Sequence, residues 1–313
     1  MNHPVIVALL PVVILIAIGF IAGRAGLMPG ESIKHLSRLV FTVFLVPLLF
    51  RTMANVHPEN LQWMPLLAYL LGMALMYVVM FIAAGRNRRA AVLGLAASYS
   101  NTVMIGIALI QFAYGEQGVA VLLALITVHS LIMLTLATLV LEWVTLHEKA
   151  AAQTGPALLK LTAQTLWNTF KQPMIFPIVA GLLYAQTNLG LPAFIDRPLQ
   201  LLANAFSPLA VVLVGLTLAT TRVGEHLRVA LGLAALKNFA HPLTVALIGW
   251  ALGLSGLPLA VMIVTASLPI GANVFLFAQR YDTALPEVTA AVAISSGAAL
   301  VTVAATLSLV RYL

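Results

Sequence analysis

This 313-residue sequence lacks cysteine and has few charged residues. The absence of cysteine excludes disulfide bonds and thiolate metal sites. Charged residues make up only 8% of the chain, whereas soluble domains average about 25%. This composition argues against a soluble enzyme, a nucleic-acid-binding protein and a disordered chain. Common catalytic motifs are also missing: there is no His-Glu-x-x-His, Gly-x-Ser-x-Gly or Walker loop. We therefore expect no catalytic residues, no metal, no cofactor and no ATP-driven pump.

Apolar residues, in contrast, make up 62% of the chain, or about 194 positions. A membrane-spanning helix requires about 20 mostly apolar residues, so this content suffices for nine or ten spans. The apolar runs are continuous rather than alternating, which argues against a transmembrane β-barrel. We predict an all-α polytopic membrane protein with ten transmembrane helices. The ten apolar windows are 4–23, 36–54, 62–84, 90–112, 118–142, 173–187, 198–220, 227–252, 257–279 and 286–310.

The longest connector follows the fifth window and contains the helix breaker Gly155-Pro156. We expect residues 146–172 to form a cytoplasmic linker between two five-helix halves, residues 1–145 and 173–313. The first apolar window has no Lys or Arg before it, so we expect a retained span rather than a cleaved signal peptide.

The basic residues predict the orientation of the spans, because cytoplasmic loops are enriched in Lys and Arg. Twelve basic residues fall on one set of alternate connectors, three fall on the other set, and Lys237 falls inside a span. The twelve are Arg24, Lys34, Arg38, Arg86, Arg88, Arg89, Lys149, Lys160, Lys171, Arg222, Arg228 and Arg280, and the three are Arg51, Arg197 and Arg311. This bias places both termini outside the cytoplasm. Because each half has five spans, the second half is then inverted, as in many secondary transporters.

The fourth span of each half is interrupted by polar or helix-breaking residues. These are Ser98, Ser100, Asn101 and Thr102 in the first half, and Pro269, Gly271, Ala272 and Asn273 in the second. Pro269 removes a backbone donor and so breaks or kinks its helix. Half-helix N-termini inside the membrane favour an anion. These residues could instead pack between helices around a tolerated kink, but their matching positions favour a substrate site where helices 4 and 9 cross.

Few ionisable residues fall deep inside the spans, and none of them is a carboxylate near a span centre. A charge placed there costs at least about 2.5–3.5 kcal/mol and usually marks a transport pathway or a relay. We interpret Lys237 and Asn238 as substrate contacts, and Lys237, His241 and His129 as coupling residues. Alternatively, Lys237 is a fixed cation that bonds the carbonyls of a broken helix, and the histidines pack as neutral side chains. The lack of carboxylates disfavours sodium coupling, although carbonyl and amide oxygens alone can also bind sodium.

Several motifs resemble the auxin efflux carrier family. The stretches 100–106 and 114–118 resemble the first crossover of that family, and 268–281 resembles the second, with special similarity to its bacterial malonate-transporter branch. Residues 39–47 and 208–218 also match, so the resemblance covers essentially the whole chain. One departure is Ala108, where the family usually has proline. The first break then depends on Ser98, Ser100 and Asn101 alone.

This resemblance implies two inverted five-helix repeats, with a scaffold and a mobile transport domain that together give elevator-type alternating access, often in a homodimer. It also implies that a small organic anion contacts Asn101 and Asn273 at the crossing. We therefore expect a proton- or potential-driven transporter of malonate-like carboxylates in a bacterial inner membrane. Other interpretations stay open: a carrier of an auxin-like aromatic carboxylate, a sodium-coupled symporter, a channel and a membrane sensor. The expected partners are the organic anion, the lipid bilayer and a second copy of the chain, with no nucleic acid.

Overall fold

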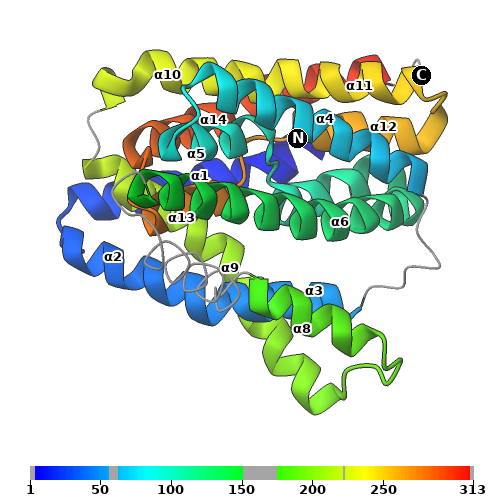
Figure 1. Ribbon diagram of the computed structural model, residues 1–313, viewed down its shortest axis with the longest axis horizontal. Coiled ribbons are helices and arrows are strands. Elements are labelled where there is room, and N and C mark those ends of the chain that lie inside the picture. Colours follow the sequence, from blue (N-terminus) through cyan, green and yellow to red (C-terminus); the bar gives the residue numbers. More distant parts are fainter. Residues whose placement is uncertain (1–3, 56–62, 151–174, 221–222, 311–313) are drawn as a thin grey trace.

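The computed structural model describes residues 4–55, 63–150, 175–220 and 223–310, and these parts of the chain are almost entirely helical (Figure 1). The described residues include three short π-helical segments, named η, which continue directly into α-helices. In chain order the elements are α1 (Pro4–Arg24), α2 (Gly30–Leu39), η1 (Val40–Phe44), α3 (Leu45–Ala54), α4 (Trp63–Ala83), α5 (Arg88–Ser98), η3 (Thr102–Gly106), α6 (Ile107–Ala150), α8 (Ile175–Ala185), α9 (Ala193–Thr220), α10 (Val223–Ala235), η4 (Leu236–Ala240), α11 (His241–Ala251), α12 (Gly256–Ser267), α13 (Ala272–Arg280) and α14 (Leu285–Val310).

The predicted all-helical class is confirmed, and each of the ten apolar windows coincides with one or more of these helices. In the described parts of the chain, five helical segments are individually long and apolar enough to cross a membrane: Gly30–Ala54, Trp63–Ala83, Ala193–Thr220, Gly224–Ala251 and Leu285–Val310. Further apolar helices are shorter, among them Phe176–Ala185 and Gly256–Ser267. The expected linker overlaps the end of α6, and its remaining residues 151–172 lie outside the described part of the chain.

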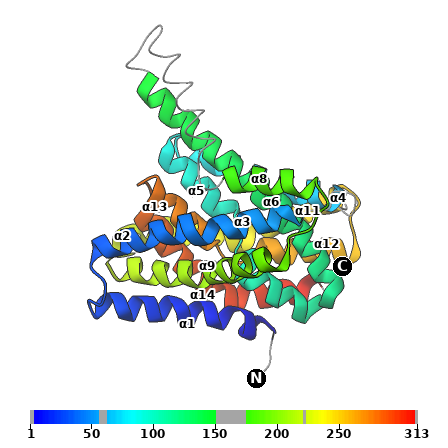
Figure 2. The same cartoon turned by 90° about the horizontal axis from the view of Figure 1, so that it is seen from below.

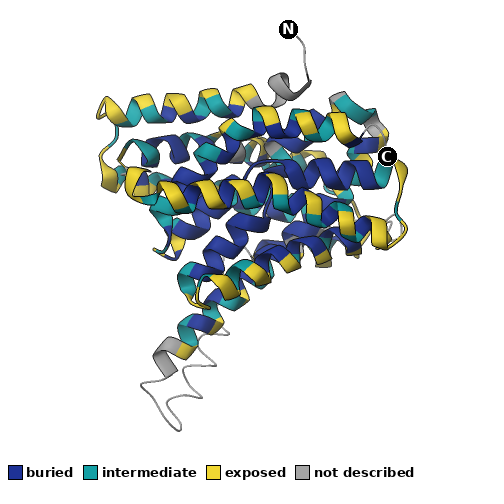
Figure 3. Cartoon of the chain, turned by 90° about the horizontal axis from the view of Figure 1, so that it is seen from above, coloured by how far each residue is buried: buried dark blue, intermediate teal, exposed yellow. Residues whose placement is uncertain are grey.

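The outer helices carry many exposed residues, while the interior of the bundle is buried (Figure 3). Many of these exposed residues are large and apolar. On α4, Leu67, Leu71 and Leu75 are each almost half exposed, and Trp250 at the end of α11 is 73% exposed. A water-soluble surface rarely carries such large contiguous apolar patches. These faces are therefore suited to contact with lipid, as expected for a multi-pass membrane protein.

The ends of several helices gather near the left of Figure 1, and they carry basic residues. They are the end of α1 with Arg24, the start of α2 with Lys34, the start of α10 with Arg228 and the end of α13 with Arg280. We call this end of the bundle the basic face. It collects residues that the charge count assigns to the cytoplasmic side.

Helices α1 and α9 run side by side (Figure 2) and approach closely because glycines line their contact. A β-carbon added at Gly19 would collide with the carbonyl group of Val212, and one added at Gly215 would collide with that of Ile16. Small residues allow this approach in membranes, where helices associate mainly by close packing. The pair α1–α9 is therefore a fixed part of the framework.

We expect Gly215→Val to destabilise the protein by about 1–3 kcal/mol, because the added side chain forces the α1 and α9 backbones apart. The measurement is the unfolding midpoint of the purified protein in detergent. Gly232→Val is the matched control, since no atom lies within 4 Å of a β-carbon at that helical position. Equal midpoints for the two variants would contradict the close packing.

Candidate functional site

The two interrupted spans break where the sequence predicts, and the two breaks cross each other. The first break covers residues 99–101 between α5 and η3, and the second covers residues 268–271 between α12 and α13. Their extended backbones pair in an antiparallel bridge between Ser100 and Ile270. The first helix is therefore fully interrupted even though Ala108 stands at the usual proline position.

Hydrogen bonds across the crossing satisfy backbone groups that the interrupted helices leave without partners. The Asn101 N–H donates to the Pro269 carbonyl at 2.9 Å, and the Gly271 N–H donates to the Tyr99 carbonyl at 3.0 Å. Gly271 has no space for a side chain, because a β-carbon there would lie 2.8 Å from the Tyr99 ring. Backbone polar groups buried in a membrane need such internal partners. Backbone hydrogen bonds therefore hold the two breaks together, and one half-helix begins at each break.

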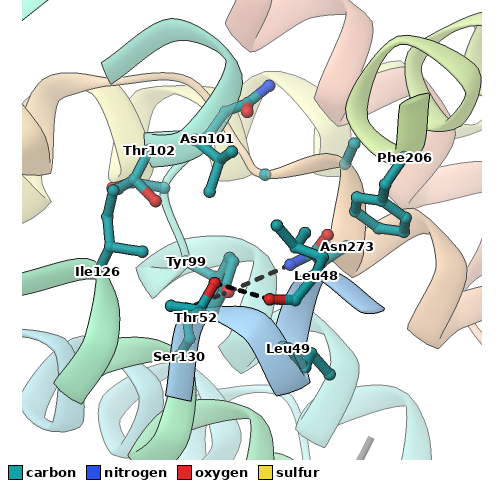
Figure 4. Close-up of a pocket in the computed structure, with 14 residues that line it drawn as sticks. Leu48, Leu49, Thr52, Tyr99, Asn101, Thr102, Ile126, Ser130, Phe206 and Asn273 are labelled. Carbon is teal, nitrogen blue, oxygen red and sulfur yellow. Dashed lines mark hydrogen bonds between the residues drawn. The ribbon is translucent and has the colours of Figure 1, made fainter. Parts of the chain in front are cut away.

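A small cavity lies beside the crossing (Figure 4). One wall is the crossing itself, and the other comes from α3, α6 and α9. The lining residues are Leu48, Leu49, Thr52, Tyr99, Ser100, Asn101, Thr102, Val103, Ile126, Ser130, Phe206, Gly271, Ala272 and Asn273. The cavity volume is about 30 Å³. That is enough for about one water molecule, whereas small-molecule pockets measure about 300–1,000 Å³. An organic anion therefore fits only if the two walls separate.

The polar side chains of this cavity form a short chain of hydrogen bonds. The Asn273 Nδ2 donates to the Tyr99 hydroxyl at 3.1 Å, and that hydroxyl lies 3.3 Å from the Ser130 Oγ. The Asn101 side chain forms no hydrogen bond with a described residue, and its amide lies apart from that of Asn273 (Figure 4). The amide of Asn101 therefore has its full hydrogen-bonding capacity left for a ligand.

The first turns of η3 and α13 border the cavity, through Thr102 on one side and Ala272 and Asn273 on the other. No side chain caps either helix start, at Asn101 or at Gly271. The N–H groups of a first turn have no partner within their own helix and, with the helix dipole, favour an anion. Both half-helices therefore contribute positive potential at one small polar cavity.

Four other predicted contacts lie outside the cavity lining. Ser98 is buried and donates to the carbonyl of Gly94 in its own helix at 2.9 Å. Pro269 supplies its carbonyl to the crossing and does not line the cavity. Lys237 and Asn238 lie on η4, also outside the lining. Six of the eight crossing residues expected from the sequence therefore border the cavity.

Lys237 is completely buried and holds the end of a half-helix. Its Nζ donates to the carbonyl of Ala266 at 2.6 Å and to that of Leu268 at 2.7 Å. These carbonyls belong to the last turn of α12 and the break that follows it, where the helix dipole is negative. This geometry agrees with the alternative interpretation of Lys237 as a cation that bonds the carbonyls of a broken helix.

Asn238 connects the same region to α14. Its Nδ2 donates to the Ser295 carbonyl at 3.0 Å and lies 3.3 Å from the Thr302 Oγ1. Ser295 also accepts the N–H of Ile270 through its Oγ at 3.1 Å. Asn238 therefore links η4 to α14, and α14 in turn bonds the second break at Ile270.

The two predicted coupling histidines lie around a buried tyrosine. The Tyr69 ring centroid is 6.0 Å from that of His129 and 6.0 Å from that of His241, and all three residues are fully buried. The Tyr99 ring also packs on His129, at 4.6 Å between centroids. Neither histidine forms a hydrogen bond of good geometry with a described residue. The Tyr69 hydroxyl lies 3.5 Å from the Ser100 Oγ and thereby joins this cluster to the crossing.

Sequence reasoning did not select several residues that build the cavity. Tyr99 lies inside the predicted motif of the first break. Ser130 directly follows His129, and this polar pair inside an apolar span is the signal that could have identified Ser130. Thr52 and Phe206 carry no such signal, because isolated Thr and Phe residues are common in spanning helices. Their role depends on which helices face the crossing.

The profile of a family described as "Membrane transport protein" matches residues 4–307, nearly the whole chain. Among curated proteins, no sequence matches this chain.

Proposed function

Because the chain belongs to the membrane transport protein family, the auxin efflux carrier family that its motifs resemble, we propose that it is a secondary active transporter of small organic anions. One observation carries the proposal: two half-helices begin at a crossing beside a cavity that Asn101 and Asn273 line. Helix starts and amide groups are suited to a carboxylate, since both offer N–H donors without adding a fixed charge.

In this proposal the ten apolar segments form ten spans in two inverted repeats. Helices α1, α2–α3, α8 and α9 form the scaffold, which is supported by the packing of α1 on α9 and of α3 on α8 and α9. The remaining helices form the transport domain that carries the crossing. The cavity lining from α3 and α9 belongs to the scaffold, whereas the crossing and the α6 residues Ile126 and Ser130 belong to the transport domain. An elevator-type movement of the transport domain would then separate the walls and admit the substrate.

The substrate of this proposal is a malonate-like carboxylate, and the membrane potential limits how it can be driven. Moving a dianion inward against 100 mV, inside negative, costs about 4.6 kcal/mol, so uptake requires roughly two protons or an equivalent gradient. We assign proton coupling to Lys237, His241 and His129. Lys237 bonds the second break, and the two histidines pack on Tyr69, whose hydroxyl lies 3.5 Å from the Ser100 Oγ. Export of the same anion would run downhill. The proposed location is a bacterial inner membrane, with both termini outside and two copies per assembly.

The experiment is uptake of labelled malonate into proteoliposomes under an imposed inward proton gradient. Unlabelled succinate, acetate and indole-3-acetate serve as competitors, and a protonophore serves as the control. We expect saturable uptake that collapses with the protonophore and for which malonate competes best. Uptake that requires sodium would contradict proton coupling. Uptake that indole-3-acetate blocks best would contradict a malonate-like substrate. Binding without any flux would instead indicate a sensor.

A further inference from the structure

A second and much larger cavity opens at the basic face. Its volume is about 730 Å³, within the range of small-molecule pockets. The polar residues that line it include Lys34, Ser37 and Arg38 of α2, Gln279 and Arg280 of α13, and Glu142 of α6. We call this cavity the basic vestibule. It is separate from the crossing cavity, because the two share no lining residue.

Three exposed cations give the basic vestibule its charge. Lys34 and Arg38 are four residues apart and so lie on one face of α2, while Arg280 ends α13 with its guanidinium 5.0 Å from the centroid of the Phe41 ring. In the described parts of the chain, no ion pair involves any of these three cations. Two carboxylates, Glu142 and Asp282, also line the cavity.

The carboxylates do not cancel this charge. Glu142 is already engaged by the Tyr281 hydroxyl, which donates to its Oε1 at 3.3 Å. Three cations against two carboxylates leave the lining with net positive charge. A net positive charge in a cleft with low-dielectric walls raises the local concentration of anions. The Gln279 amide, whose oxygen is buried without a hydrogen-bond partner in the described residues, is a further polar group at this cavity.

The same helices connect the vestibule to the crossing. Helix α13 begins with Ala272 and Asn273 at the crossing cavity and ends with Gln279 and Arg280 at the vestibule. Its nine residues span about 13 Å. The opposite wall is also shared, because the continuous segment α2–η1–α3 contributes residues to both cavities. An anion held at the vestibule is therefore one short helix length from the proposed transport site.

We propose that the basic vestibule is a separate binding site for a small carboxylate, where the anion is held by Lys34, Arg38 and Arg280 before it reaches the crossing or after it leaves. Only the identity of the anion rests on the proposed transport function. Guanidinium groups bind carboxylates through paired N–H donors, and the lysine adds a point charge. Because the three cations are exposed, binding is weak and sensitive to salt.

The test uses a single introduced cysteine, since the natural chain has none. Thr42→Cys places a thiol at an exposed position of the vestibule lining. The measured quantity is the rate at which N-ethylmaleimide labels the purified full chain, with and without malonate at constant ionic strength. Malonamide, which has the same shape without charge, is the control ligand. The measurement is repeated with Asn101→Ala and Asn273→Ala added, which disables the crossing.

We expect malonate, but not malonamide, to slow labelling equally well with an intact and a disabled crossing. Replacing Lys34, Arg38 and Arg280 by Gln should raise the half-protecting malonate concentration about tenfold. Gln at Arg24, Arg86 and Arg228 removes the same charge outside the vestibule lining and should leave that concentration unchanged.

Three outcomes would overturn the proposal: no protection by malonate, protection lost in the crossing-disabled chain, or equal effects of the two triple replacements. Protection without any malonate transport by the natural chain would support the vestibule and defeat the proposed function. Malonate transport without protection of the thiol would support the proposed function and defeat the vestibule site. The two claims can therefore fail separately.

Discussion

Lys237→Ala is expected to abolish transport, the largest effect of any single substitution considered for this protein. The Lys237 Nζ donates to two buried carbonyls at the end of α12. Truncation removes the Nζ donor from both carbonyls, at about 1–3 kcal/mol each, and removes the cation from that helix end. The second break, from which α13 and Asn273 are positioned, would lose its anchor.

Two further substitutions separate the possible roles of Lys237. Lys237→Gln keeps an amide NH2 with two N–H donors but removes the charge, while Lys237→Arg keeps the charge but cannot release a proton. If Lys237 carries the coupling proton, Lys237→Arg should exchange malonate across the membrane but fail to accumulate it under a proton gradient. If Lys237 only anchors the helix end, Lys237→Arg should do both. Normal transport by Lys237→Ala, with an unchanged pH dependence, would contradict either role.

Asn101→Ala and Asn273→Ala are each expected to weaken malonate binding by about 10–150-fold, since one hydrogen bond to a charged group contributes about 1.5–3 kcal/mol. The Asn101 side chain has no hydrogen-bond partner among the described residues, so its replacement by alanine should affect only ligand binding. Asn273 also donates to Tyr99, so its loss should additionally loosen the cavity wall. The measurement is malonate affinity by titration of the purified protein.

Charge placed at the same positions gives a sharper test. Asn101→Asp and Asn273→Asp keep the size of the side chain but put a negative charge where the anion is expected to bind, so binding should disappear. Asn204→Asp is the matched control, because Asn204 is exposed on α9 outside the cavity lining. An affinity that Asn101→Asp leaves unchanged would contradict an anion site at the crossing.

The architecture of the crossing could be predicted because its signals are local. Pro269 cannot donate a backbone hydrogen bond, and the cluster from Ser98 to Thr102 offers polar groups inside an apolar span. Each signal fixes a break to within a few residues, and the structure places both breaks there. The pairing of the two breaks at Ser100 and Ile270, in contrast, is seen only in the structure.

The position of Lys237 could be predicted only in part. Its burial follows from its place in an apolar span, but its partners Ala266 and Leu268 lie about thirty residues away in sequence. The chain also forms a π-helical turn at η4, just before Pro242, whose missing N–H opens the helical ladder. This turn changes the direction of Lys237 and Asn238 relative to a regular helix. A face drawn with regular α-helical spacing therefore does not show what they contact.

The residues of the wall opposite the crossing could not be predicted from the sequence, for a different reason. Leu48, Leu49 and Phe206 are ordinary apolar residues of spanning helices, and nothing in their spacing separates a cavity wall from a lipid face. Tyr69 is a similar case, since a tyrosine in an apolar span is usually a packing residue. Its position between His129 and His241 depends on how α4, α6 and α11 pack.

Counterflow of labelled malonate tests the central claim most directly. Proteoliposomes loaded with unlabelled malonate, without any ion gradient, would contain either the natural chain or the Asn101→Ala, Asn273→Ala double variant. A carrier with its site at the crossing should give saturable, transient accumulation of label with the natural chain and little or none with the double variant. Linear, unsaturated flux would indicate a channel, and equal counterflow by both proteins would show that the crossing is not the site.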